Sequence, residues 1–183
     1  MRPTSIDRPV APSPHQRLIA AALRYLLRAT LLRTFRAGLP VEQQRLRLRR
    51  VTRLTLPPRG ASFVRATVGG VPGEWIVVPE TRVARVLLYL HGGSFAFRFP
   101  NAHAALAARL CRQLRARALI PDYRLVPEFP FPAAPDDCHA AYRGLLAQGV
   151  DPENIVLAGD SAGGNLALVT LHRVRAAGEP LPS

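Results

Sequence analysis

Hydrophobic and polar positions from residue 61 onward predict strands that alternate with helices. Residues 63–68 alternate between outward and inward positions as in a half-buried strand, Gly69-Gly70 signals a hairpin, and residues 71–78 return as the second strand. Continuous apolar runs typical of buried parallel strands follow at 86–90, 119–121 and 155–157. Helical patterns cover 102–115, 134–147 and 162–177. This order indicates an α/β fold with a mostly parallel sheet and flanking helices.

The first 60 residues have a different pattern. Prolines at 3, 9, 12 and 14 predict an extended leader, and a helix is predicted from His15 to about Arg36. One helix face carries arginines and the opposite face is apolar: Leu18, Ile19, Ala22, Leu23 and Leu26. Three interpretations stay open: a helix that packs on the domain, a membrane-surface helix, or an arginine-rich targeting segment. We therefore divide the chain into residues 1–60 and a domain at 61–183.

Charge separates the same two regions. All 25 basic residues are arginines, and 13 of them lie in residues 1–60 against only Asp7 and Glu42. The remaining 12 arginines face 10 acidic residues, so the predicted domain is nearly neutral. Arginines at 45, 47, 49 and 50 could touch phosphates, but no interleaved aromatic residues or known module supports nucleic-acid binding. We expect no nucleic-acid partner.

A glycine-flanked serine follows the last predicted strand. Gly159, Ser161 and Gly163 form G-x-S-x-G between a strand and a helix, the pattern of a strained turn that raises a serine Oγ above the sheet. The N-terminus of the following helix favours developing negative charge. The same pattern also occurs in a plain glycine-rich turn with an incidental serine.

A second motif makes the first more specific. His91-Gly92-Gly93 follows the strand at 86–90, and acyl transfer needs preorganised donors for an oxyanion. The N–H of Ala162, directly after the serine, supplies one donor, and the N–H groups of Gly92 and Gly93 supply the others. Both motifs, each after an apolar strand and in this order, indicate a serine hydrolase site.

The sequence resembles the hormone-sensitive-lipase-like family of α/β-hydrolases, which are carboxylesterases and lipases. The resemblance rests on His91-Gly92-Gly93, on Gly159–Gly164, and on the stretch from Asp122 to Ala134. It covers about residue 64 to the C-terminus, and it implies that the N-terminal helices are cap-like. Ser94 departs from the family, which often has a third glycine there.

The resemblance implies a role for each site residue. Ser161 attacks an ester carbonyl, and a small-molecule ester is the expected substrate. His91 braces its loop and is not the base. The family pattern implies that four further residues hold the oxyanion loop in place: Asp122, Tyr123, Arg124 and Glu128. Asp160 neighbours the nucleophile, and the sequence suggests no role for it.

The catalytic acid and histidine are missing from the expected order of serine, acid and histidine. His172 lies 11 positions after Ser161 in the same predicted helix, about 16 Å away at ~1.5 Å per residue. Glu179 is the only acid after the serine. We therefore expect the N-terminal portion of an esterase, nearly inactive alone. The alternative is a non-catalytic remnant that binds a hydrophobic ligand, a membrane surface or a partner.

Other features narrow the expected chemistry. Cys111 and Cys138 lie in apolar helical contexts and are interpreted as buried thiols. Without C-x-x-C or H-E-x-x-H, we expect no metal and no cofactor. Arg24 and Arg28 interrupt the N-terminal apolar run, which argues against a secretory signal or a membrane span and for a cytoplasmic protein. Self-association through an unpaired strand edge and contact with a membrane surface are further expectations.

Overall fold

The computed structural model describes residues 13–34, 38–52, 55–82 and 84–183. Two helices come first, α1 (Pro14–Thr34) and α2 (Val41–Thr52). The predicted leader up to residue 12, and the predicted helix end at residues 35 and 36, lie outside the described residues. None of the described helices is long and apolar enough to cross a membrane.

Contacts divide the chain between Gln44 and Arg45, within α2. Leu48 on the second half of α2 is buried, and Arg45 bonds to the backbone of Ala96 and Val126. These contacts attach the end of α2 to the α/β part. Within its own unit, α1 leaves Leu18 and Leu23 exposed.

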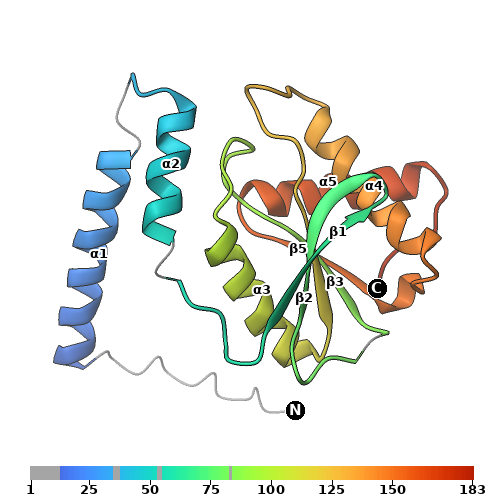
Figure 1. The fold of residues 1–183 in the computed structure, drawn as a ribbon, viewed down its shortest axis with the longest axis horizontal. Helices are drawn as coiled ribbons and strands as arrows, with labels where there is room; N and C mark the ends of the chain where they lie inside the picture. Colours follow the sequence, from blue (N-terminus) through green and yellow to red (C-terminus); the bar gives the residue numbers. More distant parts are fainter. Residues whose placement is uncertain (1–12, 35–37, 53–54, 83) are drawn as a thin grey trace, which may run out of the picture. The chain divides into compact units, whose positions relative to one another are not determined.

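The second unit contains a five-stranded sheet in the order β1-β2-β4-β3-β5 (Figure 1). Its strands are β1 (Ser62–Val68), β2 (Val71–Val77), β3 (Val86–Leu90), β4 (Arg117–Pro121) and β5 (Ile155–Gly159). β1 pairs with β2 in the predicted hairpin, and β2 runs antiparallel to β4. Since β4 and β5 each pair in parallel with β3, four strands share one direction and only β2 opposes them. The predicted mostly parallel sheet is confirmed. The prediction that residues 155–157 are all buried is wrong, because β5 is an edge strand and Val156 is exposed.

Three long helices cover the sheet: α3 (Pro100–Leu114), α4 (Ala133–Ala147) and α5 (Ala162–Ala176). A short 3₁₀ turn (Pro152–Asn154) precedes β5, and the Asp151 carboxylate caps it by accepting from Glu153 N–H. In Figure 1, α3 lies on one side of the sheet, and α4 and α5 lie on the other. The predicted helices are confirmed, with ends that differ by one or two residues.

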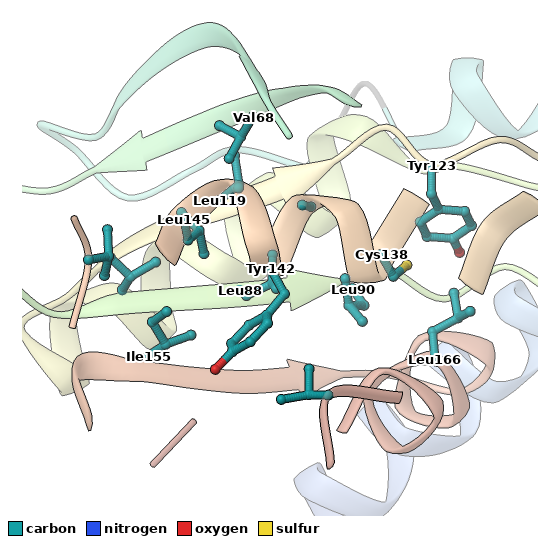
Figure 2. Close-up of a cluster of buried hydrophobic side chains, with 14 of the residues drawn as sticks. Val68, Leu88, Leu90, Leu119, Tyr123, Cys138, Tyr142, Leu145, Ile155 and Leu166 are labelled. Carbon is teal, nitrogen blue, oxygen red and sulfur yellow. The ribbon is translucent and has the colours of Figure 1, made fainter. Parts of the chain in front are cut away.

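Alternate side chains of β3 point into two separate cores, as the period of a strand requires. Leu87 and Tyr89 face α3, where they pack with small residues such as Ala108 and with Cys111. Leu88 and Leu90 face α4 and α5, where they meet larger side chains, which Figure 2 shows: Tyr142, Leu145, Ile155 and Leu166. β3 is fully buried between the two helical layers. The parallel strands therefore present their carboxyl ends, and the loops that follow them, at one edge of a rigid sheet.

Candidate active site

Ser161 stands in a strained turn between β5 and α5. Its backbone angles are φ 52° and ψ −120°, a region that residues other than glycine rarely adopt and that costs about 1–3 kcal/mol of strain. Glycines make this geometry possible, because a Cβ on Gly163 would overlap the carbonyl of Leu90, and one on Gly159 would overlap that of Gly163. The strained strand-to-helix turn predicted from G-x-S-x-G is confirmed. Ser161 is exposed at the N-terminus of α5.

Asp160 joins this turn to the loop after β3. Its Oδ1 atom accepts a 2.9 Å hydrogen bond from Gly92 N–H and a 2.7 Å bond from the Tyr89 hydroxyl. Burial and the bond to Asp160 raise the pKa of Tyr89 above its ordinary value, so the phenol stays protonated and donates. The sequence suggested no role for Asp160. The structure shows that it anchors the loop of residues 91–99, called here the oxyanion loop, to the turn at Ser161, called here the nucleophile turn.

The bond from Gly92 corrects the predicted set of oxyanion donors. Because the Gly92 N–H already donates to a carboxylate, it is not available to a substrate oxyanion in this structure. Within the part of the chain that the structure describes, the N–H groups of Gly93, Ser94 and Ala162 donate to no protein acceptor. The N–H of Gly92 anchors the loop, while the N–H groups of Gly93 and Ala162 remain free to bind an oxyanion, as expected.

Left-handed backbone shapes the loop around these groups. Gly93 has φ +125°, and a Cβ there would overlap the carbonyl of Phe97. Ser94 and Phe95 also have positive φ angles, at 53° and 57°. The carbonyl of Gly93 accepts from the N–H groups of Ala96 and Phe97, which closes the turn. The residue that replaces the family's third glycine thus adopts a glycine-like conformation and leaves its own N–H unpaired.

His91 is a buried structural residue, in keeping with the prediction. Its ring stacks on Tyr123 at 4.2 Å between centroids and on His103 at 5.0 Å. Its Nδ1 lies 2.9 Å from the carbonyl of Gly92, and the Tyr123 hydroxyl donates to the His91 carbonyl at 2.6 Å. Burial lowers the pKa of His91 to about 3, so the ring is neutral at physiological pH.

Asp122 and Arg124, both predicted to hold the oxyanion loop, form ion pairs with different segments. Asp122 pairs with Arg65 and with Arg98, which belongs to the loop after β3. Arg124 instead pairs with Asp137 of α4, and its backbone N–H bonds to the same carboxylate at 2.8 Å. The hydrogen bonds of Arg124 therefore fix the start of α4.

Glu128 reaches the loop through Arg45, a residue that the sequence did not single out for the site. Two guanidinium nitrogens bind the two Glu128 oxygens at 2.6 and 2.9 Å, which lowers the pKa of Glu128. The Nε of Arg45 donates to the carbonyl of Ala96 and another nitrogen donates to that of Val126. One side chain of α2 thus binds both segments that border the site.

None of the histidines in residues 45–183 bonds to the Ser161 hydroxyl. His103 is buried, accepts from Phe99 N–H, and has its pKa lowered to about 4 by burial. His139 lies 2.6 Å from Glu179, which follows the C-terminal end of α5. Since Ser161 precedes the N-terminal end of the same helix, and 15 residues span about 22 Å at ~1.5 Å each, this pair is remote from the serine.

An apolar cavity of about 220 Å³ borders the nucleophile turn. Asn165, whose N–H bonds to the Ser161 carbonyl, lines it beside Phe95 of the oxyanion loop. The rest of the lining is almost wholly apolar: Val126, Phe129, Phe131, Ala134, Pro135, Leu166 and Val169. Such a cavity has room for a small apolar group of a ligand.

Among the described residues there is neither a cluster of metal ligands nor a reactive cysteine. No group of three or more His, Cys, Asp or Glu side chains there could hold a metal ion. Cys111 and Cys138 are free and fully buried, as predicted. Burial raises the pKa of Cys111 to about 11, which makes it a poor nucleophile.

Comparisons with known proteins agree with this geometry. The family model for the alpha/beta hydrolase fold matches residues 87–183. An acetyl-hydrolase of Streptomyces hygroscopicus is 50% identical over 117 residues, which are 64% of this chain and 39% of that protein. The carboxylesterase/phospholipase LipF of Mycobacterium tuberculosis is 45% identical over 124 residues, 68% of this chain and 31% of its own length.

A solved structure of an esterase from the bacterial hormone-sensitive lipase family superposes with a TM-score of 0.81 at 37% identity. The match covers 94% of this chain and 56% of that one. The chain thus spans less than half the length of the two relatives above and just over half of this esterase. With the family model matching more than half of the chain and the superposition on this esterase, the chain belongs to the α/β-hydrolase fold family, in its hormone-sensitive-lipase-like branch.

Proposed function

We propose that this chain carries the nucleophile and the oxyanion donors of a serine carboxylic ester hydrolase. The observation that carries the proposal is the Asp160 carboxylate, which joins the strained Ser161 turn to the loop of Gly92 and Gly93. A serine held in this geometry beside unpaired N–H groups suits acyl transfer. Relatives described as an acetyl-hydrolase and as a carboxylesterase/phospholipase support the same reaction class.

In the proposed reaction, Ser161 Oγ attacks the ester carbonyl and its proton passes to a base. The negative charge that develops on the carbonyl oxygen is held by the N–H groups of Gly93 and Ala162, with Ser94 N–H beside them. Collapse of the intermediate releases the alcohol and leaves an acyl group on Ser161. Water then attacks the acyl carbon, which releases the acid and restores the serine.

The base is the part of this reaction that residues 45–183 do not supply. A serine hydroxyl stays protonated at neutral pH and is a weak nucleophile without an adjacent base. We therefore propose that a histidine and its acid from outside these residues complete the site. The apolar cavity beside Phe95 and Asn165 favours an ester whose acyl or alcohol group is small and apolar.

The test compares the 183-residue chain with a fusion to the C-terminal remainder of the Streptomyces hygroscopicus relative. The chain alone should hydrolyse a short p-nitrophenyl ester barely above background and label slowly with a fluorophosphonate. The fusion should raise both rates by orders of magnitude, since loss of a triad histidine costs roughly a millionfold in kcat. Ser161→Ala should abolish the gain. Rapid, stoichiometric labelling of Ser161 in the chain alone would contradict this assignment of the base.

The missing base also supports a second candidate, a non-catalytic protein that binds a hydrophobic ligand in the apolar cavity. Ligand binding without turnover, even in the fusion, would favour it. Self-association, contact with a membrane surface and a cytoplasmic location remain predictions from the sequence.

A further inference from the structure

An arginine-rich cavity of about 640 Å³ lies apart from the apolar cavity, between the end of α2 and the start of α3. Among the described residues, four arginines from three parts of the chain line it: Arg49, Arg50, Arg65 and Arg98. Asp122 is the only acidic residue among these described lining residues. None of these residues was assigned to ester hydrolysis except Asp122, which was predicted to hold the loop.

Positive charge in this cavity is not neutralised by the protein. Asp122 is shared between Arg65 and Arg98, and Glu74 approaches Arg65 only at 3.9 Å. Arg49 and Arg50 are exposed and have no acidic partner among the described residues. Like charges that converge in a concave surface repel one another and raise the local concentration of anions.

Arg98 adds a guanidinium that is largely withdrawn from solvent. Its side chain is only 17% exposed and pairs with Asp122 through one terminal nitrogen. Water and salt screen a partly buried charge less than an exposed one. The cavity thus presents exposed and partly buried guanidinium groups together.

We propose that this cavity binds the phosphate group of a phosphomonoester. Guanidinium groups match phosphate oxygens with two parallel hydrogen bonds. A phosphomonoester offers three terminal oxygens and nearly two negative charges, whereas a carboxylate offers two oxygens and one charge. The volume is in the range of small-molecule sites and exceeds what one phosphate fills, which leaves room for a larger group attached to the phosphate.

The test uses the full 183-residue chain with two probes of the same chemistry. Calorimetry with glycerol 3-phosphate, at fixed ionic strength set by chloride, measures the soluble ligand. Co-sedimentation with phosphatidylcholine vesicles, with and without phosphatidic acid, measures a phosphomonoester on a lipid. Binding to glycerol 3-phosphate identifies a soluble source. Binding only to phosphatidic-acid vesicles identifies a lipid headgroup, and either result supports the site.

Variants separate this cavity from general basicity. R49Q/R50Q should weaken binding at least about tenfold, because each arginine contributes charge-assisted hydrogen bonds to the ligand. R82Q/R175Q removes the same charge from two exposed arginines outside the cavity and should leave binding unchanged. Far-UV circular dichroism checks the fold, and single variants R49Q and R50Q carry the test if the double variant is unstable. Binding of neither probe, or equal losses in both double variants, would overturn the proposal.

Discussion

The bridge made by Asp160 gives the most direct quantitative prediction. Asp160→Ala removes the shared acceptor of Gly92 N–H and the Tyr89 hydroxyl, and leaves both donors in a partly buried place. Hydrogen bonds to a charged acceptor contribute about 1.5–3 kcal/mol each, so the loss of two should lower the free energy of unfolding by about 3 kcal/mol or more. Asp160→Asn keeps an acceptor oxygen of the same shape but makes both bonds neutral, which contribute about 0.5–1.5 kcal/mol each, so it should cost about 2 kcal/mol.

Urea denaturation followed by fluorescence of the single tryptophan measures these differences. Tyr89→Phe should cost about 1–2 kcal/mol in the wild-type background and much less in Asp160→Ala, because the two groups share one bond. Asp136→Ala is the control. It breaks the ion pair between Asp136, whose side chain is 49% exposed, and Arg173, and it should lower the free energy of unfolding by less than about 1 kcal/mol. Equal losses for Asp160→Ala and Asp160→Asn would refute the bridge.

Three further predictions concern the helix start, the buried histidines and the sheet edge. Gly163→Val should prevent soluble folding, seen as loss of a cooperative thermal transition, because its side chain overlaps the Leu90 carbonyl. His91, with its pKa lowered to about 3, should contribute stability above pH 6.5 and lose about 1.4 kcal/mol per pH unit as pH falls below that. Its imidazole NMR signals should still be those of the neutral ring at pH 5, and a titration near pH 6.5 would contradict the burial argument. β5 is the last strand of the sheet and Val156 is exposed, so light scattering should show oligomers, whereas a monodisperse monomer would refute edge pairing.

Local patterns were enough to predict the elements that position Ser161. The apolar run of β3 is short and continuous because this strand is buried on both faces. β5 departs from this pattern, since Ile155 is buried but Val156 is exposed. Glycines at 159 and 163 were informative since close backbone approach leaves no room for a Cβ. Motif and periodicity therefore located Ser161 and its turn correctly.

Long-range hydrogen bonds were beyond those patterns. The bond from Gly92 to Asp160 joins residues 68 positions apart, and the bonds from Arg45 to Glu128 join residues 83 apart. The sequence alone does not determine which hydrogen-bond partner a carboxylate beside a serine, or one arginine in a run of arginines, has in the folded chain. Sequence patterns therefore counted Gly92 among the oxyanion donors although its N–H bonds to Asp160, suggested no role for Asp160, and did not distinguish Arg45 from the neighbouring arginines.

The Asp160 carboxylate, which accepts from both Gly92 and Tyr89, also affects how the turn and the loop move relative to each other. Acyl transfer is sensitive to displacements of about 1 Å between the nucleophile and the groups that stabilise the transition state. Because Asp160 directly precedes Ser161 in the chain and holds Gly92 of the opposite loop, a shift of the turn carries that loop with it. We therefore expect the thermal fluctuations of the two segments to be correlated, so that the distance between Ser161 and the N–H groups of the loop varies less than the position of either segment.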